Sequence, residues 1–229
     1  MVRSCDRSCL FVALFVAGLA ALLAPLAAPT AEGHPSNVPG VPVAPVASIA
    51  NGPATAAAAP LNWQLDPVHC MTVFRIQHMG AGMFWGKFDG VTGTMVASED
   101  GSTVPEFDVT VAVDSVHTGS EKLDKTLKGP QFFDSKEWDV ITFKSTGGEQ
   151  VDEKTWKITG DLSLHGVTKP IEAMVEATGM IGNPVQKKAG FEARFTIKRS
   201  DYGMDWGVKN KALGDEVRLI IGLEGDWKR

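Results

Sequence analysis

Alternation of apolar and polar residues recurs through most of the chain after residue 60, and it constrains the fold more than any other feature. In residues 105–113, for example, Phe107, Val109 and Val111 occupy every second position, with charged or smaller residues between them. A period of two places successive side chains on opposite faces of a β-strand. The segments with this pattern are 70–78, 91–97, 105–113, 140–146, 155–164, 170–178, 189–198 and 216–227.

About eight short strands, each with one apolar and one polar face, predict an all-β fold of antiparallel strands. Closure into an eight-stranded up-and-down barrel would leave no exposed sheet edge. Residues 63–67 are expected to form only an extended approach to the first strand, because the residue before Pro67 is pushed out of the helical region. The glycines of residues 80–82 predict a corner where the sheet bends, and Gly86 follows as a second glycine step.

One short helix is also indicated, and we expect it to lie across one end of the barrel. Thr118 and Glu121 have the spacing of a capping box, and Leu123 and Leu127 follow on one helix face. The Gly-Pro pair at residues 129–130 would end this helix.

The first 31 residues have the organisation of a signal peptide. A weakly basic start precedes an apolar run from Leu10 to Leu23, and small residues follow it. Cleavage is expected between Ala28 and Ala31, which would place the mature protein in the periplasm or outside the cell. The alternative is an uncleaved membrane anchor, although Pro25 weakens the run as a span.

Residues 32–60 are rich in Ala, Pro, Gly and Val and contain almost no charge. Such a segment has too few large side chains to form a core, and we interpret it as a disordered tether. The folded domain is therefore expected to occupy residues 61–229.

The net charge of −5 and the lack of a basic cluster argue against nucleic acid as a partner. The same charge disfavours docking on an anionic membrane through electrostatics alone. Of three cysteines, Cys5 and Cys9 lie in the leader. Cys70 is therefore alone in the domain and cannot form a disulfide within it.

Catalytic and metal-binding patterns are weak in the domain. Its histidines, His69, His78, His117 and His165, include no pair at the close spacing typical of a metal site. Cys70 follows His69 directly, so a regular strand would point the two side chains to opposite faces. We expect neither a catalytic nucleophile nor a metal site.

The inward apolar face of the barrel is the strongest candidate for a binding surface. An eight-stranded barrel can be filled by its own side chains or can hold one ligand. Small inward residues at Gly160, Ala173, Ala177 and Ala193 favour open space. The pattern alone leaves a solid core and a ligand-holding tube equally favoured.

Several motifs resemble the YceI-like family of lipocalin-like barrels. They are Leu65-Asp66-x-x-His69, Phe74-x-Ile76-x-His78, the run GDLSLHGVTKP at residues 160–170, and Arg199-x-Asp201-Tyr202-Gly203. The resemblance implies an exported barrel that encloses a long isoprenoid or fatty chain and catalyses no reaction. Cys70 stands where a serine is common in that family.

On this resemblance the partner is an amphiphilic lipid, either a polyisoprenoid or an isoprenoid quinone, and no other cofactor is implied. Transient membrane contact is expected, and the oligomeric state stays open, a homodimer included. Two alternatives are a lipid-modifying enzyme acting at the His78 and Cys70 end, and a solid barrel that binds another exported protein. With His78 and Ser145 as polar contacts, the residues expected to contact lipid are Phe74, Ile76, His78, Phe107, Val109, Val111, Ile141, Phe143, Ser145, Ile158, Leu162, Leu164, Ala173, Val175, Ala193, Phe195, Ile197, Leu219 and Ile221.

Overall fold

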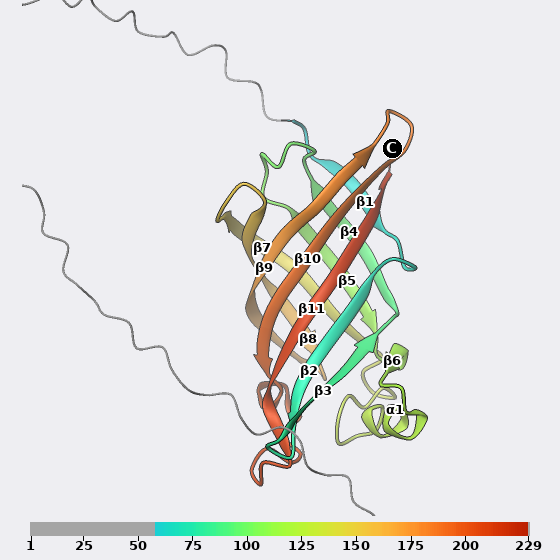
Figure 1. The fold of residues 1–229 in the computed structure, drawn as a ribbon, viewed down its shortest axis with the longest axis vertical. Helices are drawn as coiled ribbons and strands as arrows, with labels where there is room; N and C mark the ends of the chain where they lie inside the picture. Colours follow the sequence, from blue (N-terminus) through green and yellow to red (C-terminus); the bar gives the residue numbers. More distant parts are fainter. Residues whose placement is uncertain (1–57, 229) are drawn as a thin grey trace, which may run out of the picture. The chain divides into compact units, whose positions relative to one another are not determined.

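The computed structural model describes residues 58–228, so the predicted signal peptide and nearly all of the predicted tether lie outside the described range. The described strands form one antiparallel sheet in the order β1-β4-β5-β7-β8-β9-β10-β11-β2-β3-β6. Because β1 also pairs with β11, the eight strands from β1 to β11 in this order close into a barrel (Figure 1). The predicted eight-stranded, lipocalin-like barrel with one helix is confirmed. The strands are β1 (Leu61–Leu65), β2 (Met71–His78), β3 (Gly82–Phe88), β4 (Val91–Ala97), β5 (Glu106–Ala112), β6 (Val116–His117), β7 (Val140–Gln150), β8 (Thr155–Leu164), β9 (Val167–Gly182), β10 (Lys187–Lys198) and β11 (Leu213–Lys228).

Strands β1 and β2 follow one another along the same neighbour and act as one interrupted strand. The end of β11 pairs with β1, and the preceding part of β11 pairs with β2. The interruption spans Asp66 to Cys70 and includes Pro67, which has no N–H to donate to a ladder. Of residues 63–67, which were expected to form only an extended approach, residues 63–65 are therefore part of the barrel wall.

The glycine-rich corner expected at residues 80–82 is a tight turn at residues 79–81, where Met79 and Gly80 have positive φ angles of 53° and 65°. Strand β3, which was not predicted, starts at Gly82. Gly86 pairs with Phe74 across the two strands, and a Cβ at Gly86 would lie 2.3 Å from Cζ of the Phe74 ring. This glycine makes room for an aromatic ring inside the barrel rather than for a bend.

Helix α1 (Glu121–Leu127) lies beside the lower end of the barrel in Figure 1. Its N-cap is Ser120, whose side chain accepts from the Leu123 N–H, whereas Thr118 bonds to the Asp124 carboxylate. The capping residue is thus two positions later than the sequence pattern suggested. No helix within residues 58–228 is long and apolar enough to cross a membrane.

The barrel interior is solid in the half that contains β1 and the end of β11. Trp63, Met95, Trp156 and Phe191 are each at most 3 % exposed and belong to one packed cluster there. Phe107 meets the Phe191 ring edge-on at 5.4 Å. The half toward α1 also contains large aromatic side chains, among them Phe74, Phe88 and Phe133, but these surround an open cavity.

Candidate functional site: an apolar cavity in one half of the barrel

A cavity of about 490 Å³ occupies the half of the barrel toward α1. This volume falls within the usual range of small-molecule sites, about 300–1,000 Å³. Most of its lining side chains are aliphatic or aromatic. The few polar residues on the lining are Thr72, His78, Thr126, Gln131, Thr142 and Arg199. The site therefore suits an apolar chain with few polar groups.

The strands bring nearly all of the lipid-contact residues expected from the sequence to this one cavity. Alternate residues of each strand point inward, and the closed register sets neighbouring strands side by side. The expected residues that line the cavity are Phe74, Ile76, His78, Phe107, Val109, Val111, Ile141, Phe143, Leu162, Leu164, Ala173, Val175, Ala193, Phe195, Ile197, Leu219 and Ile221.

Two of the expected residues, Ser145 and Ile158, are not on the cavity lining. Ile158 points inward but is fully buried in the packed cluster of the solid half. Ser145 sits where the β7–β8 register shifts, and its Oγ accepts from the Phe107 N–H at 2.9 Å. The bulge aims this hydroxyl at the backbone of β5 rather than at the interior.

The small inward residues fall into two groups. Ala173 and Ala193 line the cavity and leave volume open. Gly160 does not, because the Phe143 ring covers it: a Cβ at Gly160 would lie 2.4 Å from Cζ of Phe143. Ala177 packs against the core cluster. Both interpretations of the interior thus apply, the solid one to one half of the barrel and the hollow one to the other.

Several residues on the cavity lining were not predicted, most of them outside the alternating segments. Leu123 and Leu127 of α1 face the cavity, as do the adjacent aromatics Phe132 and Phe133. The sequence predicts the apolar face of α1, but the residues of this segment do not indicate which surface the helix covers. The other missed lining residues are Thr72, Phe84, Phe88, Thr126, Gln131, Thr142, Arg199, Met204, Trp206, Leu213, Val217 and Leu223.

Arg199 fixes the β10–β11 connection at the α1 end of the cavity. The side chain is only 4 % exposed, and burial lowers the pKa of its guanidinium. Nε donates to the Gly214 carbonyl at 2.7 Å, Nη1 to Met204 at 2.5 Å, and Nη2 to Trp206 at 2.7 Å and Leu213 at 3.2 Å. One side chain thus holds four backbone carbonyls of a loop that has little regular structure. The loop in turn places Trp206 on the cavity, 5.5 Å from the Phe132 ring.

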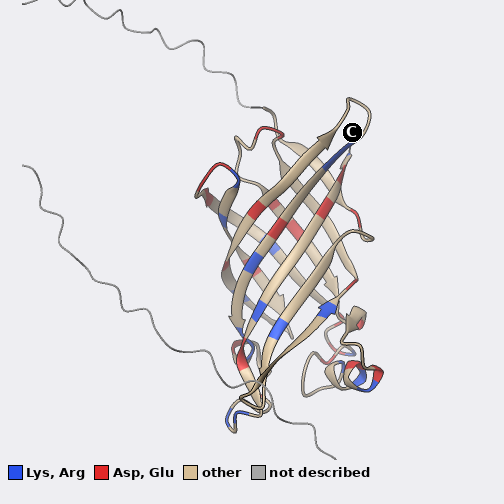
Figure 2. Ribbon diagram, viewed as in Figure 1, with Lys and Arg blue, Asp and Glu red and all other residues tan. Residues whose placement is uncertain are grey.

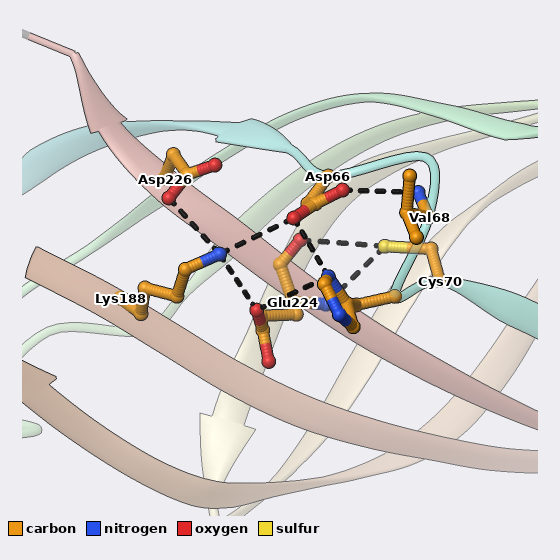
Figure 3. A network of polar contacts seen from close by, with 7 residues as sticks. Asp66, Val68, Cys70, Lys188, Glu224 and Asp226 are labelled. Carbon is orange, nitrogen blue, oxygen red and sulfur yellow. Dashed lines mark hydrogen bonds and ion pairs between the residues drawn. The ribbon is translucent and has the colours of Figure 1, made fainter.

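A polar network spans the interruption between β1 and β2 on the barrel wall (Figure 3). Lys188 Nζ lies 2.8 Å from Glu224 Oε1, 3.1 Å from Asp226 Oδ1 and 3.2 Å from Asp66 Oδ2. His69 Nδ1 lies 2.8 Å from Asp66 Oδ2. The hydrogen bond from His69, with the Val68 N–H, lowers the pKa of Asp66, and Asp66 raises the pKa of His69.

The side chains of Asp66, His69 and Glu224 are close enough together to hold a metal ion, with ligand atoms within 4.8 Å of one another. The Lys188 ammonium, however, already contacts both carboxylates of this group. A divalent cation would have to displace this ammonium, so the arrangement is that of an ion-pair network across the wall. None of its members lines the cavity.

Cys70 is buried at the end of the same interruption, 3 % exposed, and packs on the core cluster. Burial is the main cause that raises the pKa of its thiol. Cys70 directly precedes β2, and His78 is the last residue of this strand. Eight steps of extended chain separate them by more than about 20 Å, so a lipid-modifying site that combines these two residues is not assembled.

Residues 63–225 match the family model of the YceI-like domain, which is more than half of the chain. The chain belongs to the YceI-like family. Protein YceI of Escherichia coli O157:H7 is 34 % identical over 186 residues, covering 78 % of this chain and 93 % of that protein.

Solved structures of YceI-like proteins share the barrel. The YceI protein of Campylobacter jejuni is 28 % identical, with a TM-score of 0.61 over 67 % of this chain and 91 % of that one. A polyisoprenoid binding domain from Saccharophagus degradans has a TM-score of 0.56 and covers 73 % of this chain and 99 % of its own. At 18 % identity, this second likeness shows the fold alone.

Proposed function

We propose that this YceI-like barrel binds an amphiphilic lipid of the polyisoprenoid type, an isoprenoid quinone included, and holds the apolar chain in its hollow half. The observation that carries the proposal is a cavity of about 490 Å³ whose lining is almost wholly apolar. Support also comes from the S. degradans relative, which is described as a polyisoprenoid binding domain. His78, Gln131 and Trp206 line the cavity and are themselves exposed, so the polar head of the lipid would lie near them.

The affinity of such a site depends on how much of the chain it buries. Each CH₂ group removed from water contributes about 0.8 kcal/mol, so about ten of them give roughly 8 kcal/mol. This falls within the range of about 4–15 kcal/mol estimated for the loss of translational and rotational freedom on association. A short prenol should therefore bind weakly, and affinity should rise with chain length until the cavity is full.

The proposed role is to carry or sequester the lipid without changing it. Of the pair considered for a lipid-modifying reaction, Cys70 directly precedes β2 and His78 is the last residue of this strand. We further propose that the protein is exported to the periplasm or the medium and meets membranes transiently to exchange its ligand. The apolar run and small residues of the first 31 positions support export.

Mass spectrometry of solvent extracts from the purified protein tests the binding function. We expect a long-chain isoprenoid lipid in near-stoichiometric amount, and rebinding of a prenol to the delipidated protein. Absence of extractable lipid, together with no binding of prenols of any length, would refute it. Intact mass of the protein recovered outside the cytoplasm tests export: the mature chain should start between Ala28 and Ala31, and a membrane-bound chain that retains Met1 would contradict this.

A further inference from the structure

Large apolar side chains are exposed around the end of the barrel that contains the cavity. Met79 is 65 % exposed, Met83 50 %, Trp85 49 % and Trp206 46 %. The β2–β3 turn from Met79 to Met83 reads MGAGM and carries no charged or hydroxyl side chain. In a protein surrounded by water, such a cluster of exposed apolar groups marks an interaction surface.

The β2–β3 turn lies against the β10–β11 loop. Met79 N donates to the Ala212 carbonyl at 3.0 Å, and His78 pairs with Leu213. This contact places the turn beside Lys209 and Lys211, which are exposed and form no ion pair within residues 58–228. The same connection contains two acidic residues: Asp205, near the buried Arg199 guanidinium, and Asp201, which forms an ion pair with Lys169.

The charged residues are arranged differently at the two ends of the barrel. Figure 2 shows both basic residues, in blue, and acidic residues, in red, toward the lower end and on α1. The loops at the other end carry Glu99 and Asp100 after β4, and Asp152 and Glu153 after β7, with Lys154 beside them. An anionic surface would therefore be repelled by these upper loops, whereas Lys209 and Lys211 attract it locally at the lower end, although the net charge of the whole chain is −5.

We propose that the surface formed by Met79, Met83, Trp85, Trp206, Lys209 and Lys211, here called the tip surface, docks on the interface of an anionic phospholipid membrane. Trp and Met side chains insert at the boundary between head groups and acyl chains, where amphipathic rings are favoured. The two lysines contact lipid phosphates. Because Trp206 belongs to both the tip surface and the cavity lining, docking joins the membrane to the cavity. This inference rests on the proposed lipid-binding function and identifies where the ligand is exchanged.

Sedimentation of the mature protein with vesicles tests the proposal. One set contains phosphatidylcholine alone, and the other contains phosphatidylcholine with about one third phosphatidylglycerol. We expect binding to the mixed vesicles that weakens with salt. Because each lysine near an anionic surface contributes about fivefold, Lys209→Gln with Lys211→Asn should reduce the partition coefficient about 25-fold on mixed vesicles and little on neutral ones. Asparagine is chosen because Lys211 has a positive φ of 58°, which asparagine tolerates.

A second variant, Met79→Ser with Met83→Ser, should weaken binding at least tenfold to both vesicle types, because it removes the inserted apolar surface. The matched control is Ile181→Ser with Val185→Ser, at the β9–β10 turn of the opposite end, where the side chains are 79 % and 74 % exposed. The control should bind vesicles as the parent does. The proposal would be overturned if the control lost as much vesicle binding as the Met79→Ser, Met83→Ser variant, or if the parent did not sediment with vesicles. The tip surface would then be a contact for another protein.

Lipid cargo is measured separately by loading each delipidated variant with a prenol from detergent micelles. The tip-surface variants should load as the parent does, because their substituted side chains lie outside the cavity lining. A parent that fails to load from detergent disproves the lipid-binding function, whereas normal loading without vesicle binding disproves only the docking.

Discussion

The thiol of Cys70 bonds to both backbone polar groups of Glu224. Sγ lies 3.3 Å from the Glu224 carbonyl oxygen, to which it donates, and 3.2 Å from the Glu224 nitrogen, from which it accepts. Glu224 is in β11, opposite the interruption between β1 and β2. At Glu224 the backbone of β11 has no strand partner on the side that faces β1 and β2. The thiol and the Asp66 N–H, which also donates to the Glu224 carbonyl, take the place of the missing ladder.

Substitutions of Cys70 should separate the contribution of its hydrogen bonds to stability from the contribution of its size. Cys70→Ala leaves the Glu224 N–H without its partner, while the carbonyl keeps the Asp66 N–H, and it should lower the free energy of unfolding by about 1–3 kcal/mol. Cys70→Ser keeps a donor and an acceptor and should cost less than about 1 kcal/mol. Urea unfolding of the three proteins measures both values. Equal losses for the two variants would mean that the sulfur acts only by filling space.

Burial of Cys70 also predicts a poorly reactive thiol. Because burial raises the thiol pKa, the native protein keeps its proton at a pH at which the unfolded chain begins to lose it. The contribution to stability is therefore complete below about pH 8.5 and decreases as pH rises through the folded pKa. A water-soluble maleimide should label the native protein slowly and the urea-unfolded protein rapidly. Rapid native labelling would contradict the burial.

The Asp66–His69 pair predicts a pH-dependent contribution to stability. The pKa of His69 is raised from 6.5, so its contribution is present below about pH 6.5 and is lost as pH rises through the folded pKa. The pKa of Asp66 is lowered from 3.8, so its contribution is lost as pH falls below that value. The pair contributes most between these limits. NMR titration of the His69 ring proton should give a pKa above 6.5, and Asp66→Asn should lower it. An unchanged midpoint in that variant would show that Asp66 is not the cause.

Arg199 is expected to be essential for the loop that closes the α1 end of the cavity. Arg199→Lys keeps the charge but cannot reach four carbonyls with one ammonium, so we expect a loss of at least about 3 kcal/mol in the free energy of unfolding. Hydrogen exchange of residues 203–214 should accelerate more than that of β8. As a control, Arg218→Lys changes an exposed arginine of β11 and should alter stability by less than about 0.5 kcal/mol. Similar effects of the two changes would contradict the role of Arg199.

The sequence predicts the strands well where alternation is regular and bulky residues face inward. Residues 155–164 form β8 within the expected bounds, and β4 likewise matches 91–97. Strand β3 was not predicted, and nothing in its sequence indicates that the missing side chain of Gly86 makes room for the Phe74 ring. The prediction also fails at Ser145, because a bulge depends on the pairing of two strands and not on either sequence alone.

The division of the interior into a solid and a hollow half is not visible in any single segment. Trp63, Trp156 and Phe191 come from distant parts of the chain and meet at one level only when the register is fixed. Ile158, next in phase after Trp156, is therefore packed, while Leu162 further along β8 reaches the cavity. The sequence predicts which side chains point into the barrel, but it does not predict at which level along the barrel axis each of them lies.

Two alanines on the same face of β10 test this division directly. Both belong to the buried core, but Ala193 lines the cavity, whereas Ala189 is 1 % exposed and is not on the cavity lining. Ala193→Trp should fill free volume, so lipid recovered with the protein should fall sharply while the stability of the delipidated protein stays nearly unchanged. Ala189→Trp should instead overpack the core and cost about 1–3 kcal/mol or more.

Stability is compared after delipidation, because bound lipid would itself raise the apparent stability of the parent by mass action. Thermal unfolding and lipid extraction of the parent and both variants then give two independent measurements. If the α1 half were packed to ordinary protein density, Ala193→Trp would destabilise the protein as much as Ala189→Trp does, and the parent would yield no lipid. That pair of results would show that the barrel is solid throughout and that the lipid-binding function is wrong.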